Sequence, residues 1–113
     1  MKLAGNLWGA ALAALFCTSV LAQADEARAT KIVTGTCFLC HGAEGESSSE
    51  VFPRLAGQHW EYVAKQLENF KSGKRKSTAM ADMVAKLTPD EMVALGQYFE
   101  KKTLDEIILE KIK

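Results

Sequence analysis

The sequence predicts an all-α domain on three observations. Between Trp60 and Phe70, apolar residues recur at i, i+3, i+7 and i+10, which is the spacing of one buried helical face. The string "TPDEM" carries the signals of a helix start, because Thr88 is a natural N-cap, Pro89 fits the first helical position and Glu91 completes a capping box. No stretch alternates apolar and polar residues as a strand does, and the sequence contains no βαβ unit or internal repeat.

The earlier helices follow from the same periodicity and from their end signals. A first helix is expected over about residues 26–34, ending at Gly35. The second covers residues 58–72 and ends at Gly73, after which a basic loop leads into a methionine-containing turn. Residues 42–57 contain too many Gly, Ser and Pro residues for regular structure.

The last part of the chain predicts two further helices. The helix that begins at Thr88 is expected to bury one face, made of Met92, Leu95, Gly96 and Phe99. The tail, residues 103–113, can form a short amphipathic helix, with apolar positions at Leu104, Ile107, Ile108 and Ile112.

The first 24 residues have the three parts of a secretory signal peptide. Lys2 supplies the basic start, residues 7–22 are mostly apolar, and Ala22-Gln23-Ala24 is a small-x-small cleavage site. The apolar run of roughly 16 residues is shorter than the roughly 20 that span a bilayer, which argues against an uncleaved membrane anchor. We therefore expect cleavage after Ala24 and export to the periplasm.

Cleavage would leave a domain at residues 25–102 and the tail at residues 103–113. The whole sequence has 14 basic and 14 acidic residues. Removing Lys2 with the signal peptide leaves a net charge of about −1, which favours neither nucleic acid nor an anionic membrane as a partner, and no stable membrane insertion is expected. Only Cys37 and Cys40 remain, so there is no disulfide framework, and a domain this small often depends on a metal or a cofactor.

The string "CFLCH", residues 37–41, is compatible with three kinds of site. A structural zinc site needs four ligands, usually in two pairs, and outside this string only His59 remains. A thioredoxin-type dithiol has the same cysteine spacing and would suit an exported protein, but its fold needs a central sheet. Covalent attachment of a haem accounts for the spacing and for the histidine together.

The haem interpretation has a geometric basis. Cys37 and Cys40 lie at i and i+3, so one helical turn directs both sulfurs to the same side, where each can bond one haem vinyl group. His41 follows directly and can place its imidazole beneath the iron. A single covalent haem c would also supply apolar core to a small domain.

Two longer strings resemble a known family. Residues 52–58 read "FPRLAGQ" and residues 66–75 read "QLENFKSGKR". They are similar to the FPxLAGQ and QLxxFxxGxR motifs of small periplasmic monohaem cytochromes, which are class I c-type cytochromes, and the likeness extends over residues 30–102. It implies about four to five helices wrapped round one haem, with the N- and C-terminal helices crossing at the small Gly96.

The second axial ligand has to come from the other face of the haem, and the candidates are Met80, Met83, Met92 and His59. Met92 fits a core position better, and His59 fits a solvent-facing position at a helix start. The resemblance assigns the ligand to Met80, with Met83 as the alternative.

The resemblance also assigns roles around the first ligand. The Pro53 carbonyl is expected to accept a hydrogen bond from the His41 Nδ1–H, which would fix the imidazole and raise its basicity. Arg54 is expected near a haem propionate, and its alternative role is that of an ordinary surface arginine.

With both axial positions filled, the implied function is that of a one-electron carrier between larger redox proteins, not an enzyme. One alternative is a cytochrome subunit of a larger oxidoreductase, because "FKSGKRKSTAM" also resembles the cytochrome subunit of flavocytochrome sulfide dehydrogenases, whose partner is a flavoprotein. Another is a ligand-binding haem sensor or a peroxidase-like enzyme, which would need a labile methionine. The basic run of Lys71, Lys74, Arg75 and Lys76 could steer an acidic partner toward the haem edge.

Overall fold

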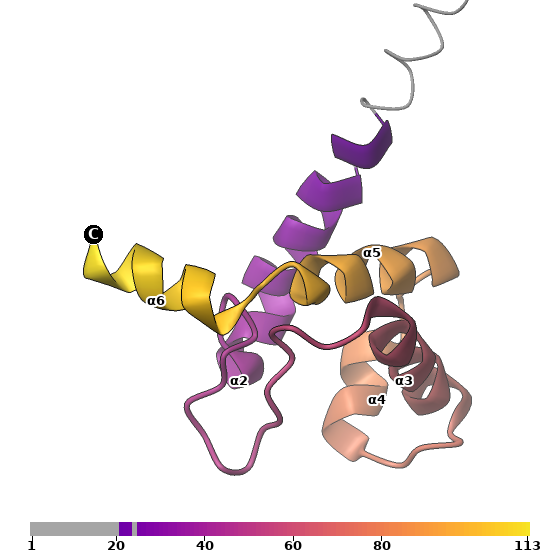
Figure 1. Cartoon of the computed structure of the whole chain (residues 1–113). Coiled ribbons are helices and arrows are strands. Elements are labelled where there is room, and N and C mark those ends of the chain that lie inside the picture. Colours follow the sequence, from indigo (N-terminus) through magenta and orange to yellow (C-terminus); the bar gives the residue numbers. More distant parts are fainter. Residues whose placement is uncertain (1–20, 24) are drawn as a thin grey trace, which may run out of the picture.

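The computed structural model describes residues 21–23 and 25–113, and the regular structure in these residues is helical, without a strand. The all-α prediction is therefore confirmed. Residues 25–32 are helical, and the elements that follow are η1 (Val33–Cys37), α2 (Phe38–His41), α3 (Trp60–Ser72), α4 (Thr78–Val84), α5 (Pro89–Glu100) and α6 (Leu104–Ile112) (Figure 1). Most of the predicted signal peptide, residues 1–24, and its cleavage point at Ala24 lie outside the described residues. Within the described part of the chain, no helix has the length and hydropathy needed to cross a membrane.

The N-terminal helix continues past the point where the sequence predicted its end. Residues 25–32 run through the π-helical turn η1 into α2, and Gly35 lies inside this run. The prediction was wrong because glycine ends a helix by adopting a positive φ, and Gly35 has none. The helix ends instead at Gly42, whose φ is 83° and whose N–H donates to the Phe38 carbonyl at 3.0 Å. The "CFLCH" string is therefore helical throughout.

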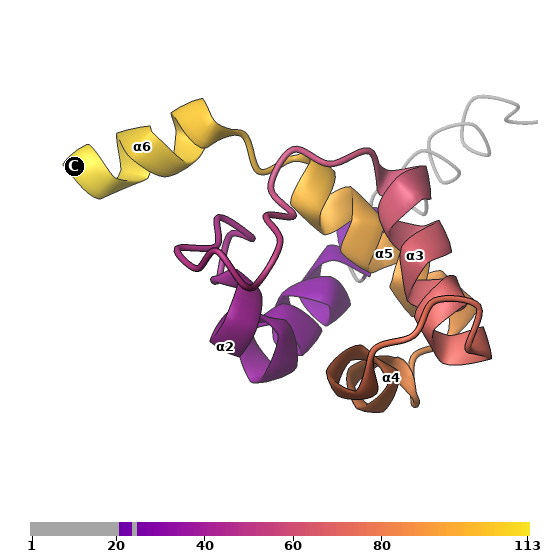
Figure 2. The same cartoon turned by 90° about the horizontal axis from the view of Figure 1, so that it is seen from below.

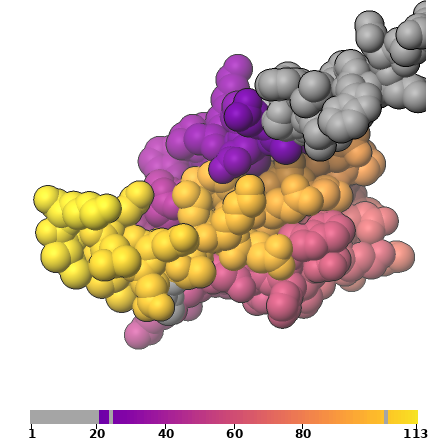
Figure 3. Space-filling view, turned by 45° about the horizontal axis from the view of Figure 1, so that its top comes forward, coloured from indigo at the N-terminus to yellow at the C-terminus, as the bar shows by residue number. Residues whose placement is uncertain are grey.

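The core lies where the N-terminal helix, α3 and α5 meet. Ala29 and Val33 of the N-terminal run share one buried cluster with Leu95 and Tyr98 of α5, and α3 contributes Val63. Figure 3 shows α5 lying between the N-terminal helix and α3. The family resemblance implied that the N-terminal helix crosses the C-terminal helix of the domain, which is α5. This crossing is confirmed (Figure 1).

Gly96 permits a close helix approach, but its neighbour is α3 and not the N-terminal helix. A Cβ atom at Gly96 would lie 2.5 Å from the backbone oxygen of Trp60, the first residue of α3. The expectation that the N-terminal helix packs against Gly96 was wrong. A small residue indicates that some helix can approach closely, but tertiary packing decides which helix it is. The same corner is held by the Trp60 N–H, which donates to the Glu100 carboxylate at 3.2 Å.

The predicted start and buried face of α5 are confirmed. The Thr88 hydroxyl accepts from the Glu91 N–H at 3.2 Å, and the Glu91 carboxylate accepts from the Thr88 N–H at 2.9 Å. All four predicted face residues are buried: Met92, Leu95, Gly96 and Phe99. This helix is the scaffold against which the other segments are placed.

Two short helices lie outside this core. The predicted methionine-containing turn is the helix α4, which Ser77 caps by accepting from the Met80 N–H at 3.3 Å, and α4 packs on α3. The tail forms the predicted helix, α6, which extends away from the other helices in Figures 1 and 2. Ile107 of α6 is buried, whereas Ile108 and Ile112 are 52% and 75% exposed.

Candidate functional site

His41 ends α2 and is 8% exposed. Its Nδ1 lies 2.8 Å from the carbonyl oxygen of Pro53. Because a carbonyl can only accept, Nδ1 carries the proton in this contact, which corresponds to the tautomer whose Nε2 keeps a lone pair for a metal. The side chain is thus oriented with one ring nitrogen available to a metal.

The loop of residues 42–57, which contains Pro53, folds back on the end of α2. The Ser47 N–H donates to the His41 carbonyl at 2.9 Å. The Gly45 carbonyl accepts from the Leu55 N–H at 2.8 Å, which joins the two halves of the loop. These backbone bonds determine where Pro53 lies relative to the imidazole.

The two cysteines lie one helical turn apart. Cys37 is the last residue of η1 and Cys40 belongs to α2, and both are free thiols. Cys37 is partly buried, and burial raises the pKa of its thiol, while its backbone hydrogen bond acts in the opposite direction. Cys40 is exposed. The helical backbone thus offers two thiols and, in the next residue, an imidazole.

Large apolar side chains near these residues remain open to solvent. Leu39 and Val51 are 74% and 80% exposed, and Phe38 and Phe52 are 40% and 38% exposed. The Phe52 ring meets His41 edge-on, with 6.3 Å between ring centroids. Exposed apolar groups around a buried ligand-type imidazole and two thiols fit a large apolar, metal-containing group.

The two candidate methionines lie on α4, at i and i+3, and therefore on one side of that helix. Met80 is half-buried and Met83 is 50% exposed. Figures 1 and 2 show α2 and α4 as separate arms on the same side of α5. The fold thus places the methionine segment and the histidine segment on one side of the molecule.

The other predicted site residues have defined places. The Arg54 Nε donates to the Glu46 carbonyl at 3.2 Å. The His59 side chain is 86% exposed at the start of α3, with its Nδ1 3.5 Å from the Glu100 carboxylate. Met92 is 5% exposed, as expected for a core residue.

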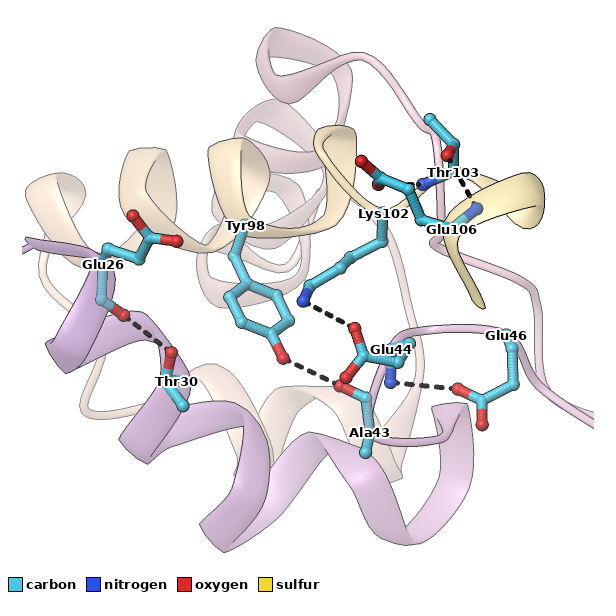
Figure 4. Close-up of polar contacts among 9 residues, drawn as sticks. All are labelled: Glu26, Thr30, Ala43, Glu44, Glu46, Tyr98, Lys102, Thr103 and Glu106. Carbon is cyan, nitrogen blue, oxygen red and sulfur yellow. Dashed lines mark hydrogen bonds and ion pairs between the residues drawn. The ribbon is translucent and has the colours of Figure 1, made fainter. Parts of the chain in front are cut away.

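A further group of contacts near His41 could not be found from the sequence. The Tyr98 hydroxyl donates to the Ala43 carbonyl at 3.0 Å, and the Lys102 ammonium lies 2.6 Å from the Glu44 carboxylate (Figure 4). Tyr98 precedes Phe99 in α5, but no local signal in the sequence indicates that its hydroxyl reaches a residue 55 positions away.

Residues 24–99 match the protein family described as "Cytochrome C oxidase, cbb3-type, subunit III". The chain belongs to this family of c-type cytochromes. The predicted resemblance to class I c-type cytochromes is therefore confirmed.

Individual relatives agree with this assignment. The chain is 43% identical over 77 residues to cytochrome c4 of Thiocapsa roseopersicina, covering 68% of this chain and 38% of that protein. It is 38% identical over 69 residues to the cytochrome subunit of sulfide dehydrogenase of Chlorobaculum tepidum, covering 61% and 62%. The crystal structure of reduced cytochrome c4 from Pseudomonas stutzeri matches with a TM-score of 0.64 and 31% identity, covering 72% of this chain and 50% of that one. The chain thus spans half or less of the cytochrome c4 proteins that it matches.

Family membership implies a haem c that is bound covalently, so this part of the prediction is also confirmed. The residues present fit such a group: two thiols one turn apart, an oriented imidazole and exposed apolar side chains lie in or beside one helical segment.

Proposed function

We propose that this chain is an exported one-electron carrier, in which Cys37 and Cys40 bond the haem and the iron is held between His41 and Met80. The observation that carries the proposal is the buried His41 imidazole, whose Nδ1 faces the Pro53 carbonyl at 2.8 Å. When bound, the haem supplies an iron that gains and loses one electron. The chain is not expected to catalyse a reaction of its own.

Cys37 and Cys40 would attach the haem by addition of their thiols to its two vinyl groups. In each addition the sulfur forms a carbon–sulfur bond and the thiol hydrogen goes to the neighbouring vinyl carbon, so no oxidant is needed. Their spacing of one turn supports this role, because it directs both sulfurs to one side.

His41 and its neighbours would determine the basicity of the first ligand. A hydrogen bond from Nδ1–H to a carbonyl fixes the ring and increases electron density on Nε2. Pro53 would provide that carbonyl. Arg54 would lie near a haem propionate, while its Nε donates to the Glu46 carbonyl.

Met80 is the proposed second ligand, and Met83 is the alternative. Met80 is the less exposed of the two, and Ser77 fixes its backbone N–H at the start of α4. A thioether ligand favours the reduced iron and raises the reduction potential. A filled second position also leaves no site for oxygen or substrate, which separates a carrier from a haem sensor or a peroxidase-like enzyme.

The cellular place of the protein is part of the proposal. A signal peptide at residues 1–24 with cleavage after Ala24 would deliver residues 25–102 as the cytochrome domain, with residues 103–113 as a tail, to the periplasm. The basic start, short apolar run and small-x-small end support export.

A second candidate function is supported by the sulfide dehydrogenase relative and by α6. In this version the chain is the cytochrome subunit of a larger oxidoreductase with a flavoprotein partner. Ile108, Leu109 and Ile112 are each more than half exposed on α6, outside the stretch that matches the family. Purification of the native complex decides between the two: a flavoprotein in equal amount would favour the subunit, and its absence the free carrier.

The proposal is tested by one set of spectra on protein produced in a host that attaches haem. We expect haem that survives acid–acetone extraction, a weak methionine–iron charge-transfer band in the oxidised protein, and no shift when carbon monoxide is added to the reduced protein. A carbon monoxide shift without that band would mean an open iron and would favour the sensor or enzyme. Absence of covalent haem would reject the proposal.

A further inference from the structure

Tyr98, in the last turn of α5, and Lys102, two residues after that helix, hold the segment that follows His41. The Tyr98 hydroxyl donates to the Ala43 carbonyl at 3.0 Å, and the Lys102 ammonium lies 2.6 Å from the Glu44 carboxylate (Figure 4). Ala43 and Glu44 come directly after Gly42, where the chain leaves the helix of the "CFLCH" string. The Tyr98 contact therefore acts on the backbone two residues after His41, and the Lys102 contact acts on the side chain of the next residue.

The Lys102–Glu44 ion pair differs from the other ion pairs at this end of α5. Its side chains are 30% and 29% exposed, whereas those of the neighbouring Lys101–Glu26 pair are 63% and 59% exposed and 3.5 Å apart. The Lys102 ammonium also lies 4.8 Å from the centre of the Tyr98 ring, a cation–π contact. Burial disfavours the charged form of Lys102, but the hydrogen bond to Glu44 and the nearby charges outweigh it and raise the pKa of Lys102. Lys102 therefore stays charged at neutral pH.

The same end of α5 also holds the far end of the loop. The Gly57 N–H donates to the Phe99 carbonyl at 2.8 Å. The Phe99 ring packs on Gly45, where a Cβ atom would lie 2.7 Å from it. The loop of residues 42–57 is thus attached to α5 near both of its ends, and Pro53 lies between the two attachments.

We propose that Tyr98 and Lys102 are positioning residues for His41. They fix the backbone at Ala43 and Glu44, and with it the orientation in which the Nδ1–H reaches the Pro53 carbonyl. Neither contact involves the imidazole itself, so the effect is transmitted by the loop. The proposal rests on the proposed role of His41 as the iron ligand. Loss of either contact weakens the attachment of the loop at Ala43 and Glu44 and allows this end of the loop to open more often.

The test measures solvent exchange of the His41 Nδ1 proton by NMR in reduced, haem-loaded protein. Tyr98→Phe keeps the ring and removes only the hydroxyl, and Lys102→Met keeps the chain length and removes the charge. We expect each change to speed exchange of this proton by about fivefold, the effect of one lost hydrogen bond on local opening. The amides of residues 43–47 are expected to exchange faster as well, and the reduction potential to shift in the same direction in both variants.

Lys101→Met is the matched control, because it removes an exposed ion pair from the same end of α5. We expect parental exchange rates in this control. If Tyr98→Phe and Lys102→Met lower the melting temperature but exchange the Nδ1 proton no faster than Lys101→Met, the two residues only stabilise the fold and the inference is wrong. Should Lys102→Met fail to accumulate, Glu44→Gln removes the other charge of the pair and must give the same acceleration.

The NMR spectrum of the reduced parent protein shows whether a negative result concerns this inference alone or also the proposed function. If the His41 ring protons show no large ring-current shift in the reduced parent, His41 is not the iron ligand, and the proposed ligand set fails together with the inference. If the parent shows that shift and the variants exchange like the control, only the inference fails.

Discussion

His41 and Met80 come from segments that the chain holds in different ways. His41 is buried, its imidazole faces the Pro53 carbonyl, and the loop after it is attached to α5. Met80 lies in a helix of seven residues whose one buried residue is Val84 and whose start depends on the Ser77 cap. The histidine segment is thus held by contacts between distant parts of the sequence, and the methionine segment mainly by local ones.

The proposed site should open first at its methionine side. Short helices with few buried side chains unfold locally at a small free-energy cost, whereas segments tied to the core open with the whole domain. We therefore expect the methionine–iron bond to break at lower denaturant concentrations than the histidine–iron bond.

The largest effect is expected from Met80→Ala. If Met80 is the ligand, this change abolishes the methionine–iron charge-transfer band, and the reduced protein then binds carbon monoxide. The His41 segment does not depend on α4, so we expect the haem to stay covalently attached and the domain to stay folded. Absorption spectra with and without carbon monoxide measure both effects.

Met83→Ala is the matched control for that change, because Met83 lies on the same helix and is 50% exposed. We expect its band and its carbon monoxide response to equal those of the parent. The reverse result, with the band lost only in Met83→Ala, would move the proposed ligand to Met83.

The next largest effect is expected from Gly45→Ala on the histidine side. Gly45 has a φ of 75°, and a Cβ atom there would lie 2.7 Å from the Phe99 ring and 3.0 Å from the Ala56 backbone nitrogen. We expect the free energy of unfolding to fall by about 3 kcal/mol, because backbone strain adds to a clash in a packed region. Urea unfolding of the haem-loaded protein measures this loss.

Gly73→Ala provides the comparison on the side that leads to α4. Gly73 has a similar φ of 79°, but no atom lies within 4 Å of a Cβ built there. Only the conformational strain remains, which costs about 1 kcal/mol. Equal losses in the two variants would contradict the view that the histidine loop is the more tightly packed of the two.

Local signals in the sequence predicted the local features well. The Thr88–Glu91 capping box and the helix end at Gly73 follow from the sequence because all the atoms involved lie within a few residues. The helix end predicted at Gly35 was wrong, because a glycine permits a helix to end without requiring it. The neighbour of Gly96 was also assigned wrongly, because that depends on which helices pack together.

In the candidate site, too, local features could be predicted from the sequence and contacts between distant segments could not. The spacing of Cys37, Cys40 and His41 follows from the string itself, and family resemblance supplied Pro53 before the structure placed its carbonyl 2.8 Å from the imidazole. The Tyr98 and Lys102 contacts could not be predicted, because hydrogen bonds between distant segments leave no periodic pattern in the sequence.

A smaller effect is expected from Ser77→Ala, which removes the cap of α4. The lost hydrogen bond to the Met80 N–H costs about 1 kcal/mol, so α4 should open about fivefold more often. We expect the amide protons of α4 to exchange with solvent about fivefold faster in the haem-loaded protein, as measured by NMR, because their exchange follows local opening of this helix.

Thr88→Ala removes a comparable cap from α5 and is the control for this change. It should lower the free energy of unfolding by a similar amount and leave the exchange rates of the α4 amides as in the parent. A similar acceleration in both variants would mean that opening of α4 requires global unfolding, and the comparison between the two segments would fail.

The smallest effect concerns the basic run of Lys71, Lys74, Arg75 and Lys76, which covers the end of α3 and the loop leading to α4. Two of its cations are used within the chain: Lys71 donates to the Leu87 carbonyl, and Arg75 donates to Gln66 at 2.8 Å. Lys74 and Lys76 are exposed, and the charge of each can be reversed without breaking these two hydrogen bonds.

We expect Lys74→Glu combined with Lys76→Glu to slow electron transfer to an acidic acceptor protein about threefold at low salt, and to have little effect near 0.5 M salt, on the order of the ionic strength at which such charges are screened. Lys31→Glu, an exposed reversal on the N-terminal helix, controls for net charge and should leave the rate nearly unchanged. Stopped-flow rates at both salt concentrations decide the matter. If the double variant and the parent react equally fast at both, the acceptor does not approach through the methionine side, and the more rigid histidine side becomes the expected docking face.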